Sequence, residues 1–276
     1  MKIQILGTAA AEGWPAIFCT CPQCKAARKN GGKDLRTRAS TLIDDQILID
    51  FSADTYSNAL RFGLDLSTVH TLLVTHDHED HLYSDDLGMR YPGFSHLDET
   101  RPAQMMVYGN DRVGQRTQIS IAQYGGAGCV AFTRLKPFET YALPGGYAFT
   151  ALTAIHDRTQ QDYLYYVTDA SGKSMLYGHD TGLFPEDTMA FLAGKHLDFV
   201  MLDCTCGDEH DGGNHMGFCD DLVMRDRLKE AGCVDEKTEL VITHFSHNGH
   251  LLHDQLCALA NPEGFDVAYD GVIYEV

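Results

Sequence analysis

Short hydrophobic runs alternate with amphipathic stretches and turn residues along the chain. Runs rich in β-branched and aromatic residues predict strands, whereas apolar positions spaced three or four apart predict helices. We expect strands at 2–6, in a hairpin over 41–50, at 71–74, 104–109, 147–155, 163–168, 174–178, 199–203 and 240–243, and two short strands near the end. We expect helices at about 55–63, 112–124, 185–194, 219–231 and 251–260. No repeat, low-complexity tract or Pro-rich linker interrupts this pattern, which indicates one domain over residues 1–276.

Potential metal ligands stand at the ends of four of these strands. A metal-binding imidazole must be neutral and a carboxylate ionised, so crowding such groups is costly unless a cation compensates them. On an extended strand end, His76 and His78 would share one face and hold one ion, whereas Asp80 and His81 would reach a second. Seven nitrogen and oxygen ligands in total suit a two-metal hydrolytic site. The candidate ligands are His76, His78, Asp80, His81, His156, Asp180 and His244.

A structural interpretation competes with this hypothesis. Residues 76–81 could form a solvated loop that opens a helix with Asp80 as its N-cap. Taken singly, His156 and His244 are typical of hydrogen-bonded core histidines, and Asp180 is typical of a turn. The density of ligands in residues 76–81 favours a metal site.

Composition and charge limit the class of partner. Hydrophobic residues make up 44% of the 276 residues and charged residues 22%, as in ordinary globular proteins. The formal net charge of -18 opposes binding to nucleic acids and anionic membranes. A small anionic substrate remains compatible, because a bound metal can dominate the local field. No apolar run approaches the roughly 20 residues of a membrane span, and residues 1–6 resemble a strand rather than a secretion signal, so we expect a cytoplasmic protein.

The nine cysteines suggest metal binding rather than a disulfide framework. Cys19, Cys21 and Cys24 lie within six residues, and three thiolates with one histidine form a closed zinc site. The spacing leaves the fourth ligand open, and free thiols or a redox pair are the alternative. A second, weaker group contains Cys204, Cys206, His210, His215 and Cys219.

The sequence resembles the metallo-β-lactamase superfamily. The resemblance rests on the His-x-His-x-Asp-His run at 76–81, the later His156, the Gly-x-Asp-Thr at 178–181 and the Thr-His at 243–244. It implies an α/β fold, a four-layer αβ/βα sandwich of two mixed sheets with helices on the outer faces and metals at one edge. It also implies that Asp50 orients a ligating histidine. The implied ligands are His76, His78 and His156 for one metal, Asp80, His81 and His244 for the other, and Asp180 as the bridge.

Within the superfamily, the chain most resembles the phosphodiesterases of the carbon-phosphorus lyase pathway, which open phosphoribosyl 1,2-cyclic phosphate. The resemblance rests on the start 6–8 with 13–15, the three-cysteine motif, Asn214-His215 and the Thr-His-Phe-Ser-His run at 243–247. It implies that His247 completes a structural zinc site with Cys19, Cys21 and Cys24, in a zinc-binding loop at about 14–30. His250 and His253 are the rival donors. It also makes His215 a catalytic residue, together with Asp80.

The expected function is a dinuclear metal-dependent hydrolase. It would carry two Zn or Mn ions at the active site and one structural Zn, and attack a small cyclic or sugar phosphodiester with a metal-bridging hydroxide. His215 would protonate the leaving group. The alternatives are a lactonase or thioesterase on the same fold, and a non-hydrolytic accessory protein resembling the pyrroloquinoline quinone biosynthesis protein. The acidic composition disfavours RNA processing of the tRNase Z type.

Some features match no motif. Residues 83–97 and 111–129 have no counterpart in the pattern, although such segments often shape a pocket. The acidic loop 206–211 would oppose a highly charged substrate unless it points outward. The sequence is compatible with a homodimer but requires none.

Overall fold

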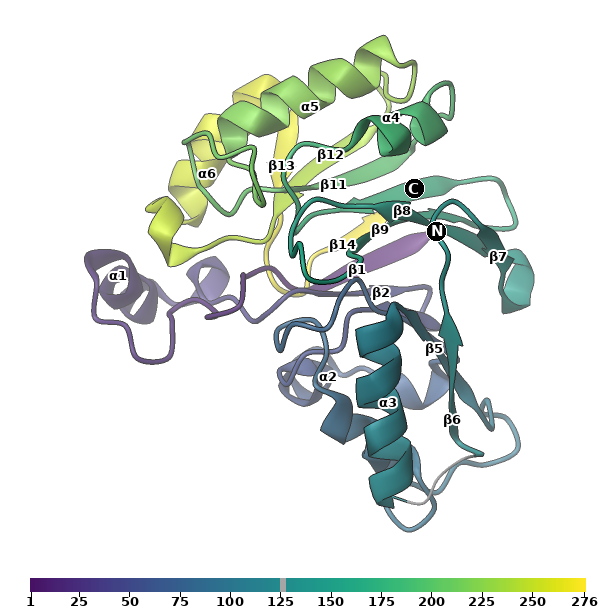
Figure 1. The fold of residues 1–276 in the computed structure, drawn as a ribbon. Coiled ribbons are helices and arrows are strands. Elements are labelled where there is room, and N and C mark those ends of the chain that lie inside the picture. Colours follow the sequence, from purple (N-terminus) through teal and green to yellow (C-terminus); the bar gives the residue numbers. More distant parts are fainter. Residues whose placement is uncertain (125–127) are drawn as a thin grey trace.

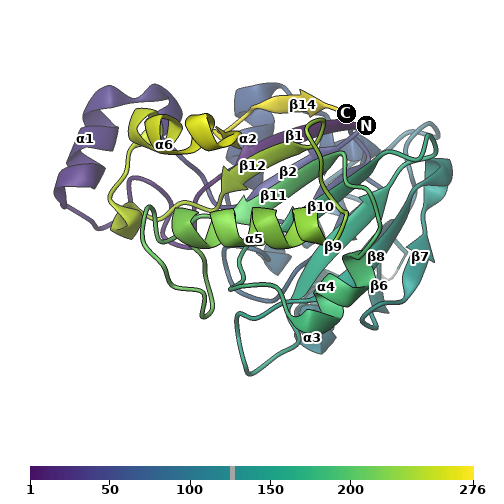
Figure 2. The same cartoon turned by 90° about the horizontal axis from the view of Figure 1, so that it is seen from above.

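Two sheets packed face to face form the centre of the computed structural model, which describes residues 1–124 and 128–276. Helices cover the outer face of each sheet (Figure 1), and the view from above shows one layer of helices lying over the strands (Figure 2). This arrangement is the four-layer αβ/βα sandwich expected from the sequence, and it confirms the predicted fold class.

The first sheet contains seven strands in the order β14-β1-β2-β3-β4-β5-β6. The strands from β3 to β6 run parallel, whereas β14, β1 and β2 pair antiparallel, so the sheet is mixed. Its strands are β1 (Lys2–Gly7), β2 (Ser40–Ile43), β3 (Ile47–Ile49), β4 (Thr71–Leu73), β5 (Met105–Gly109), β6 (Val130–Arg134) and β14 (Ile273–Glu275).

The second sheet also contains seven strands, in the order β13-β12-β11-β10-β9-β8-β7. The strands from β10 to β13 run parallel, whereas those from β7 to β10 alternate in direction. Its strands are β7 (Thr140–Ala142), β8 (Ala148–Thr153), β9 (Tyr163–Thr168), β10 (Ser174–Gly178), β11 (Phe199–Asp203), β12 (Glu239–Thr243) and β13 (Phe265–Val267).

The helices divide between the two outer faces (Figure 1). Helices α2 (Thr55–Phe62) and α3 (Asp111–Tyr124) cover the first sheet. Helices α4 (Glu186–Leu192), α5 (Phe218–Glu230) and α6 (His253–Ala260) cover the second. The remaining helix, α1 (Pro22–Asn30), lies beside α6 at one end of the sandwich (Figure 2), and its buried Cys24 and Ala27 belong to the core cluster of the second sheet. None of the helices in the described part of the chain combines the length and apolar character needed to cross a bilayer.

Three layers of core separate these elements. Between the sheets, residues such as Ile3, Phe149 and Tyr165 are fully or almost fully buried. A second cluster lies between the first sheet and its helices, and a third between the second sheet and its helices. Central strands such as β11 are therefore buried on both faces, which explains why they appear in the sequence as continuous hydrophobic runs.

The expected elements are present, and three further ones were not predicted. Strands β6 and β7 were missed, and residues 22–30 form α1 where a loop was expected. Pro22 stands in the first turn of α1 and the Cys21 side chain accepts a hydrogen bond from Cys24 N, both of which favour a helix start. Because α1 is mostly polar, its hydrophobic pattern is too weak to indicate a helix.

Candidate metal centre

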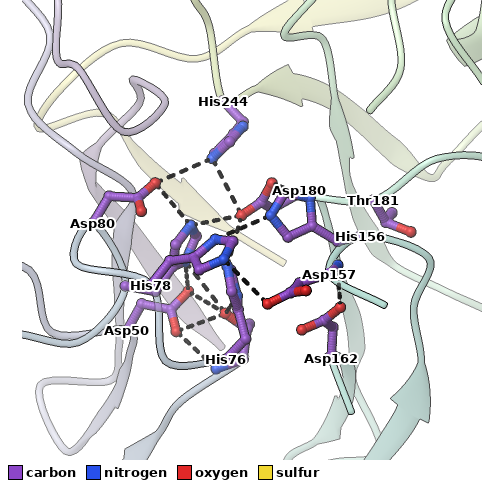
Figure 3. A network of polar contacts seen from close by, with 12 residues as sticks. Asp50, His76, His78, Asp80, His156, Asp157, Asp162, Asp180, Thr181 and His244 are labelled. Atoms are coloured by element: carbon purple, nitrogen blue, oxygen red, sulfur yellow. Dashed lines mark hydrogen bonds and ion pairs between the residues drawn. The ribbon is translucent and has the colours of Figure 1, made fainter. Parts of the chain in front are cut away.

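The loops that follow four strands meet at one edge of the sandwich (Figure 3). Residues 76–81 follow β4 of the first sheet, whereas His156, Asp180 and His244 follow β8, β10 and β12 of the second. These three strands of the second sheet point in the same direction, so their carboxyl ends lie at the same edge. A rigid sheet edge holds loop side chains in a defined geometry.

All of the candidate ligands come together in two groups that share Asp180. In the first group, His156 Nε2 lies 3.1 Å from His78 Nδ1, and His76 Nε2 lies 3.3 Å from Asp180 Oδ2. Within each group, one ligand atom per residue lies within 4.8 Å of the others. The groups are His76, His78, His156 and Asp180, and Asp80, His81, Asp180 and His244.

The second group is the more deeply buried. His81 Nε2 lies 2.8 Å from Asp180 Oδ2 and 3.2 Å from Asp80 Oδ2. His244 Nε2 lies 3.7 Å from Asp180 Oδ2. Each of these residues is at most 4% exposed. The same oxygen of Asp180 therefore faces both groups, which is the geometry that a bridging carboxylate requires.

Buried polar atoms without a well-aligned hydrogen bond indicate what the site is built for. The Nε2 atoms of His76, His81 and His244 lie 2.8–3.7 Å from Asp180 Oδ2 but make no hydrogen bond of good geometry, and Asp180 Oδ1 makes none either. Buried polar atoms are almost always paired, so several unpaired ones aimed at one point need an explanation. A divalent cation bound there would satisfy them, and the donor set fits Zn²⁺ or Mn²⁺.

The opposite nitrogens of the same rings have partners. His81 Nδ1 lies 2.7 Å from Asp50 Oδ2, the contact expected of an orienting carboxylate. His76 Nδ1 lies 3.0 Å from Thr75 Oγ1, and His244 Nδ1 lies 2.8 Å from Thr205 Oγ1. Partners of this kind fix the ring orientation of metal-binding histidines and leave Nε2 free for the metal.

The charges in the centre keep the carboxylates ionised. Burial alone would raise the pKa of Asp180, but His244 and His81 hold that pKa well below its usual range. His81 in turn has its pKa raised well above normal, because Asp80 and Asp50 outweigh the effect of burial. Burial lowers the pKa of His76. Ionised carboxylates beside imidazoles form the environment in which a cation replaces protons.

Three residues at this edge have left-handed backbone conformations. Asp50, Asp180 and His244 have φ angles of 61°, 57° and 62°. Such conformations cost about 1–2 kcal/mol for residues other than glycine. The left-handed residue turns the chain sharply where Asp180 and His244 follow their strands, and strain of this kind is often found at functional sites.

One local expectation was wrong, and one competing interpretation is excluded. Strand β4 ends at Leu73, so His76 and His78 lie in the loop beyond it, His78 in a bend, rather than on an extended strand end. The amide groups of His81 and Leu82 both donate to His78 O, which closes a turn and brings the ligands together. The following 3₁₀ helix begins at Ser84, so Asp80 is not an N-cap; the side chain is buried instead, which contradicts the solvated-loop interpretation.

His215 and Asp203 adjoin the two groups. His215 Nδ1 lies 3.2 Å from Asp203 Oδ2 and 3.3 Å from Asp180 Oδ1. Burial lowers the pKa of His215, but Asp203 and Asp180 outweigh it and raise this pKa to about 9. Asp203 also accepts hydrogen bonds from the amide groups of Asp180, Thr205 and Met216. Sequence reasoning missed this role of Asp203, although a carboxylate that ends a buried strand could have indicated it.

A cavity of about 450 Å³ opens onto these residues. His215 and several candidate ligands form its floor, among them Asp180 and His244. Residues 83–97 and the described part of 111–129 lie outside its lining. Further side chains that line it are Glu12, Thr205, Cys206, Glu209, Ser246 and Asn248.

The three cysteines of the N-terminal region form a separate group with His247. The four ligand atoms lie within 4.8 Å of one another, and His247 Nδ1 is 3.6 Å from Cys21 Sγ. Although burial opposes it, hydrogen bonds from Cys24, Cys19 and His247 lower the pKa of Cys21 to about 6. These donors form the closed set typical of structural zinc.

The rival ligands lie elsewhere. His253 Nδ1 is 3.2 Å from Arg36 Nη2, and the cysteine group does not include His250. The weaker second group does not converge among the described residues: Cys204, Cys206 and Cys219 make separate contacts with Gly207 O, Asp211 Oδ2 and Asp208 O. His210 lies against Asp220.

Comparison with solved structures supports the same fold. A diphosphatase from the PhnP family is 24% identical, with a TM-score of 0.75, over 100% of this chain and 97% of that one. Zn²⁺-bound PqqB from Methylobacterium extorquens is 20% identical, with a TM-score of 0.72, over 100% of both chains. The short form of human tRNase Z is 15% identical, with a TM-score of 0.68, over 100% of this chain and 99% of that one.

Sequence comparison gives the family. Among curated proteins, none matches the sequence. The beta-lactamase superfamily domain matches residues 45–245, a span that contains the histidine-rich loop, His156, Asp180 and His244. Because this match covers most of the chain and the sheets have the corresponding architecture, the chain belongs to the metallo-β-lactamase superfamily.

Proposed function

We propose that the protein is a metal-dependent hydrolase that cleaves a small phosphodiester, such as a cyclic or sugar phosphate. One observation carries the proposal: three buried imidazole Nε2 atoms without partners converge on Asp180 at the floor of a cavity that also contains His215. Side chains from both sheets contribute, so the fold itself assembles the site. The likeness to a diphosphatase of the PhnP family supports phosphoryl chemistry.

Two divalent cations would be held by the two groups, with Asp180 between them. When bound, such a pair acidifies a water molecule and offsets the charge that develops on a phosphoryl oxygen. Asp80 would contribute to catalysis as a metal ligand in the second group, where it lies against His81. Asp50 would keep the His81 ring oriented throughout.

His215 is suited to protonate the leaving group. Its Nδ1 faces Asp203 and Asp180, and the ring lines the cavity. With one ring nitrogen held by carboxylates, the other can carry a proton towards a substrate in the cavity. An alkoxide leaves a phosphodiester slowly unless a general acid protonates it, and such acids contribute about 10²–10⁴-fold.

The cysteine group would hold a structural zinc. It would fix residues 19–24 to His247, three residues after His244. The backbone already joins these regions, because Phe245 N donates to Thr8 O and Ala10 N donates to Phe245 O. A zinc at this position would therefore stabilise the segment that carries a catalytic ligand.

The test uses protein loaded with Mn²⁺ or Zn²⁺ and two phosphodiesters: bis(p-nitrophenyl) phosphate, whose phenolate leaves without protonation, and a ribose 2′,3′-cyclic phosphate, whose leaving group is an alkoxide. We expect hydrolysis of at least one ester by the native protein, and a loss of at least about 100-fold in kcat for His215→Ala with the cyclic phosphate, the range given for a general acid. Elemental analysis should show equal metal content in the two proteins. The variant His196→Ala, at an exposed position in the loop between α4 and β11, is the matched control.

Three outcomes would change the proposal. Turnover of the cyclic phosphate by His215→Ala at the native rate would remove His215 from the mechanism. Hydrolysis of homoserine lactones or thioesters, with phosphodiesters left intact, would replace phosphodiester cleavage with attack on a carbonyl group. A protein that binds one zinc per chain and no further metal would support an accessory role instead.

A further inference from the structure

The charged side chains that line the cavity outside the two ligand groups are Glu12, Glu209 and the catalytic His215. Glu12 stands in the turn after β1, and Glu209 in the loop between β11 and α5. Glu12 and Glu209 line the same cavity as Asp180 and His244, the residues whose buried atoms lack well-aligned hydrogen bonds. The cavity therefore has a metal-binding floor and acidic side chains on its wall.

The position of Glu12 is fixed by neighbouring groups. Ser246 Oγ donates to Glu12 Oε1 at 2.5 Å, and His247 Nε2 lies 3.7 Å from the same oxygen. The carboxylate is 31% exposed, so it is neither buried in the core nor free in solvent. A carboxylate held in this way presents its charge to the cavity without having to be ordered by the substrate.

Three arginines near the site are paired with carboxylates, whereas the exposed Arg158, two residues after His156, has no ion pair among the described residues. Two of the paired arginines come from α3 and flank the loop that carries His78. Pairing of this kind weakens the attraction of these three arginines for a second phosphate group on a substrate. The pairs are Arg38 with Asp54 at 3.0 Å, Arg112 with Asp77 at 3.8 Å, and Arg116 with Asp77 at 3.2 Å and with Glu79 at 2.9 Å.

We propose that the substrate is a zwitterionic phosphodiester, with its phosphoryl group at the metal centre and an ammonium group on one ester arm beside Glu12 and Glu209. The inference rests on the proposed function and narrows its substrate class. A volume of about 450 Å³ suits a molecule of this size. Two carboxylates attract an ammonium group and repel an additional anionic group. They therefore favour a zwitterionic phosphodiester over a phosphodiester with a second anionic group.

The reaction needs no further reactant. Water adds across one P–O ester bond, which gives a phosphomonoester and an alcohol. His215 gives its proton to the departing oxygen, and the proton released from the attacking water restores it. The ammonium group keeps its charge throughout, so its contact with Glu12 and Glu209 contributes to binding rather than to the chemical step.

The test compares two esters that differ only in this charge. One is p-nitrophenyl phosphorylcholine, and the other is 3,3-dimethylbutyl p-nitrophenyl phosphate, in which carbon replaces the ammonium nitrogen. Both release p-nitrophenol, so leaving group and size are matched. For the metal-loaded protein we expect kcat/KM for the choline ester to be about tenfold higher, the effect of two partly exposed carboxylates on one cation. Raising the ionic strength from about 20 mM to about 500 mM should reduce this ratio.

Glu209→Gln is the first variant because Glu209 lies in an exposed loop and its replacement leaves the core intact. We expect the ratio of the two kcat/KM values to fall towards one. Glu230→Gln, which removes an exposed charge from the end of α5, should keep the native ratio. Glu12→Gln should act in the same direction as Glu209→Gln, with zinc content measured because Glu12 lies beside His247.

The outcomes separate this inference from the proposed function. Hydrolysis of both esters with equal kcat/KM, or an unchanged ratio in both variants, would overturn the inference alone. Hydrolysis of neither ester, nor of bis(p-nitrophenyl) phosphate, would overturn the proposed function and this inference with it.

Discussion

Asp203 is a single side chain that contacts several parts of the centre. It accepts hydrogen bonds from the amide groups of Asp180, Thr205 and Met216, and it lies 3.2 Å from His215 Nδ1. The residue is fully buried. It therefore joins the loop after β10, the loop after β11 and the proposed general acid.

Replacing this carboxylate by an amide should impair catalysis more than folding. In Asp203→Asn we expect kcat for a phosphodiester to fall by about 10–100-fold, the usual effect of losing an outer partner of a metal site. The Asn side chain would point its NH₂ group at one of the groups that now donate to Asp203. The contact that positions His215 would then be lost. Steady-state kinetics and metal content measure the effect, with the exposed Asp254→Asn as control. A kcat within twofold of the native value would contradict this role.

His253 allows a prediction about pH and stability away from the metal centre. Burial, with the positive charges of Arg36 and Lys33, lowers the pKa of His253 to about 4. In the unfolded chain this pKa is about 6.5, so between these values the unfolded state binds the extra proton. This contribution to stability is complete above about pH 6.5 and is lost as the pH falls towards 4.

The variant His253→Asn keeps an acceptor for Arg36 and removes the titration. We expect the free energy of unfolding to fall less steeply from pH 6.5 to 4 in His253→Asn than in the native protein. Urea unfolding of both metal-loaded proteins across this range measures the difference. Parallel pH dependences would show that His253 keeps its ordinary pKa in the fold.

Single residues differ in how well sequence predicts their place. The histidines and aspartates at strand ends could be selected because ligand chemistry and strand position agree. Glu12 and Glu209 could not, since each stands in a turn or loop without a motif and reaches the cavity only through tertiary packing. His215 stands in a glycine-rich loop, where the residue pattern gives no sign of a catalytic role. Only the resemblance to a family indicated that role.

At the scale of elements, the loops that follow the strands determine the geometry of the centre. The loop after β10 packs closely against residues 211–214. An added Cβ at Gly182 would lie 2.1 Å from Gly213 O, so the two loops need this glycine. One of these loops carries Asp180 and the other leads to His215.

The variant Gly182→Ala should therefore separate Asp180 from His215. We expect a loss of phosphodiesterase activity and a destabilisation of about 1–3 kcal/mol, the usual cost of overpacking. Thermal unfolding and steady-state kinetics measure both effects. Gly128→Ala is the control, because an added Cβ there meets nothing within 4 Å. Native activity in Gly182→Ala would show that the two loops can shift without harm.

Helix α1 supports a second prediction. Cys21 caps this helix and is one of the four groups near His247. In Cys21→Ser we expect one zinc per chain fewer and a lower Tm, because the zinc would no longer link residues 19–24 to His247. Elemental analysis and calorimetry are the measurements, and Cys129→Ser, outside the group, is the control. Unchanged zinc content would contradict the structural zinc site.

Elements were predictable where pattern and burial agree. Strands β10, β11 and β12 are buried over most of their length and appear as clear hydrophobic runs. Strand β7 has three residues, none of them buried, so its sequence has no strand signal. Its pairing with β8 holds it in the sheet, and such long-range pairing is not encoded in local periodicity.

For the molecule as a whole, the excess of negative charge should make the free energy of unfolding depend on bound metal ions. The formal net charge is -18, and several carboxylates meet at the edge of the sandwich. Bound cations should stabilise the protein by about 4 kcal/mol when free metal is 1,000 times its dissociation constant. For a chain of this size, that corresponds to a change in Tm of roughly 10 °C.

Removing the metals with a strong chelator should lower Tm by this amount. Added salt should restore part of the loss, because it screens the repulsion between the carboxylates. Differential scanning calorimetry of chelated, reloaded and salt-treated protein measures these effects. Equal Tm values for chelated and reloaded protein would contradict a contribution of metals to stability.

The global architecture came from the resemblance to a family rather than from the pattern of residues. Periodicity indicates strands and helices, but it does not give the order of strands within two sheets, such as β14 beside β1. Because the strands at the site come from distant parts of the chain, their meeting depends on the complete fold. The edge at which they meet was predictable once the superfamily was known.

The places of His244 and His247 affect how the protein matures during synthesis. Each completes a different group of ligands, and both lie late in the chain. More than 200 residues have to be synthesised after Cys24 before either set has all its donors. Nascent chains would therefore expose thiols and imidazoles before either metal site is complete. Full metal loading has to wait until the last parallel strands have joined the sheet.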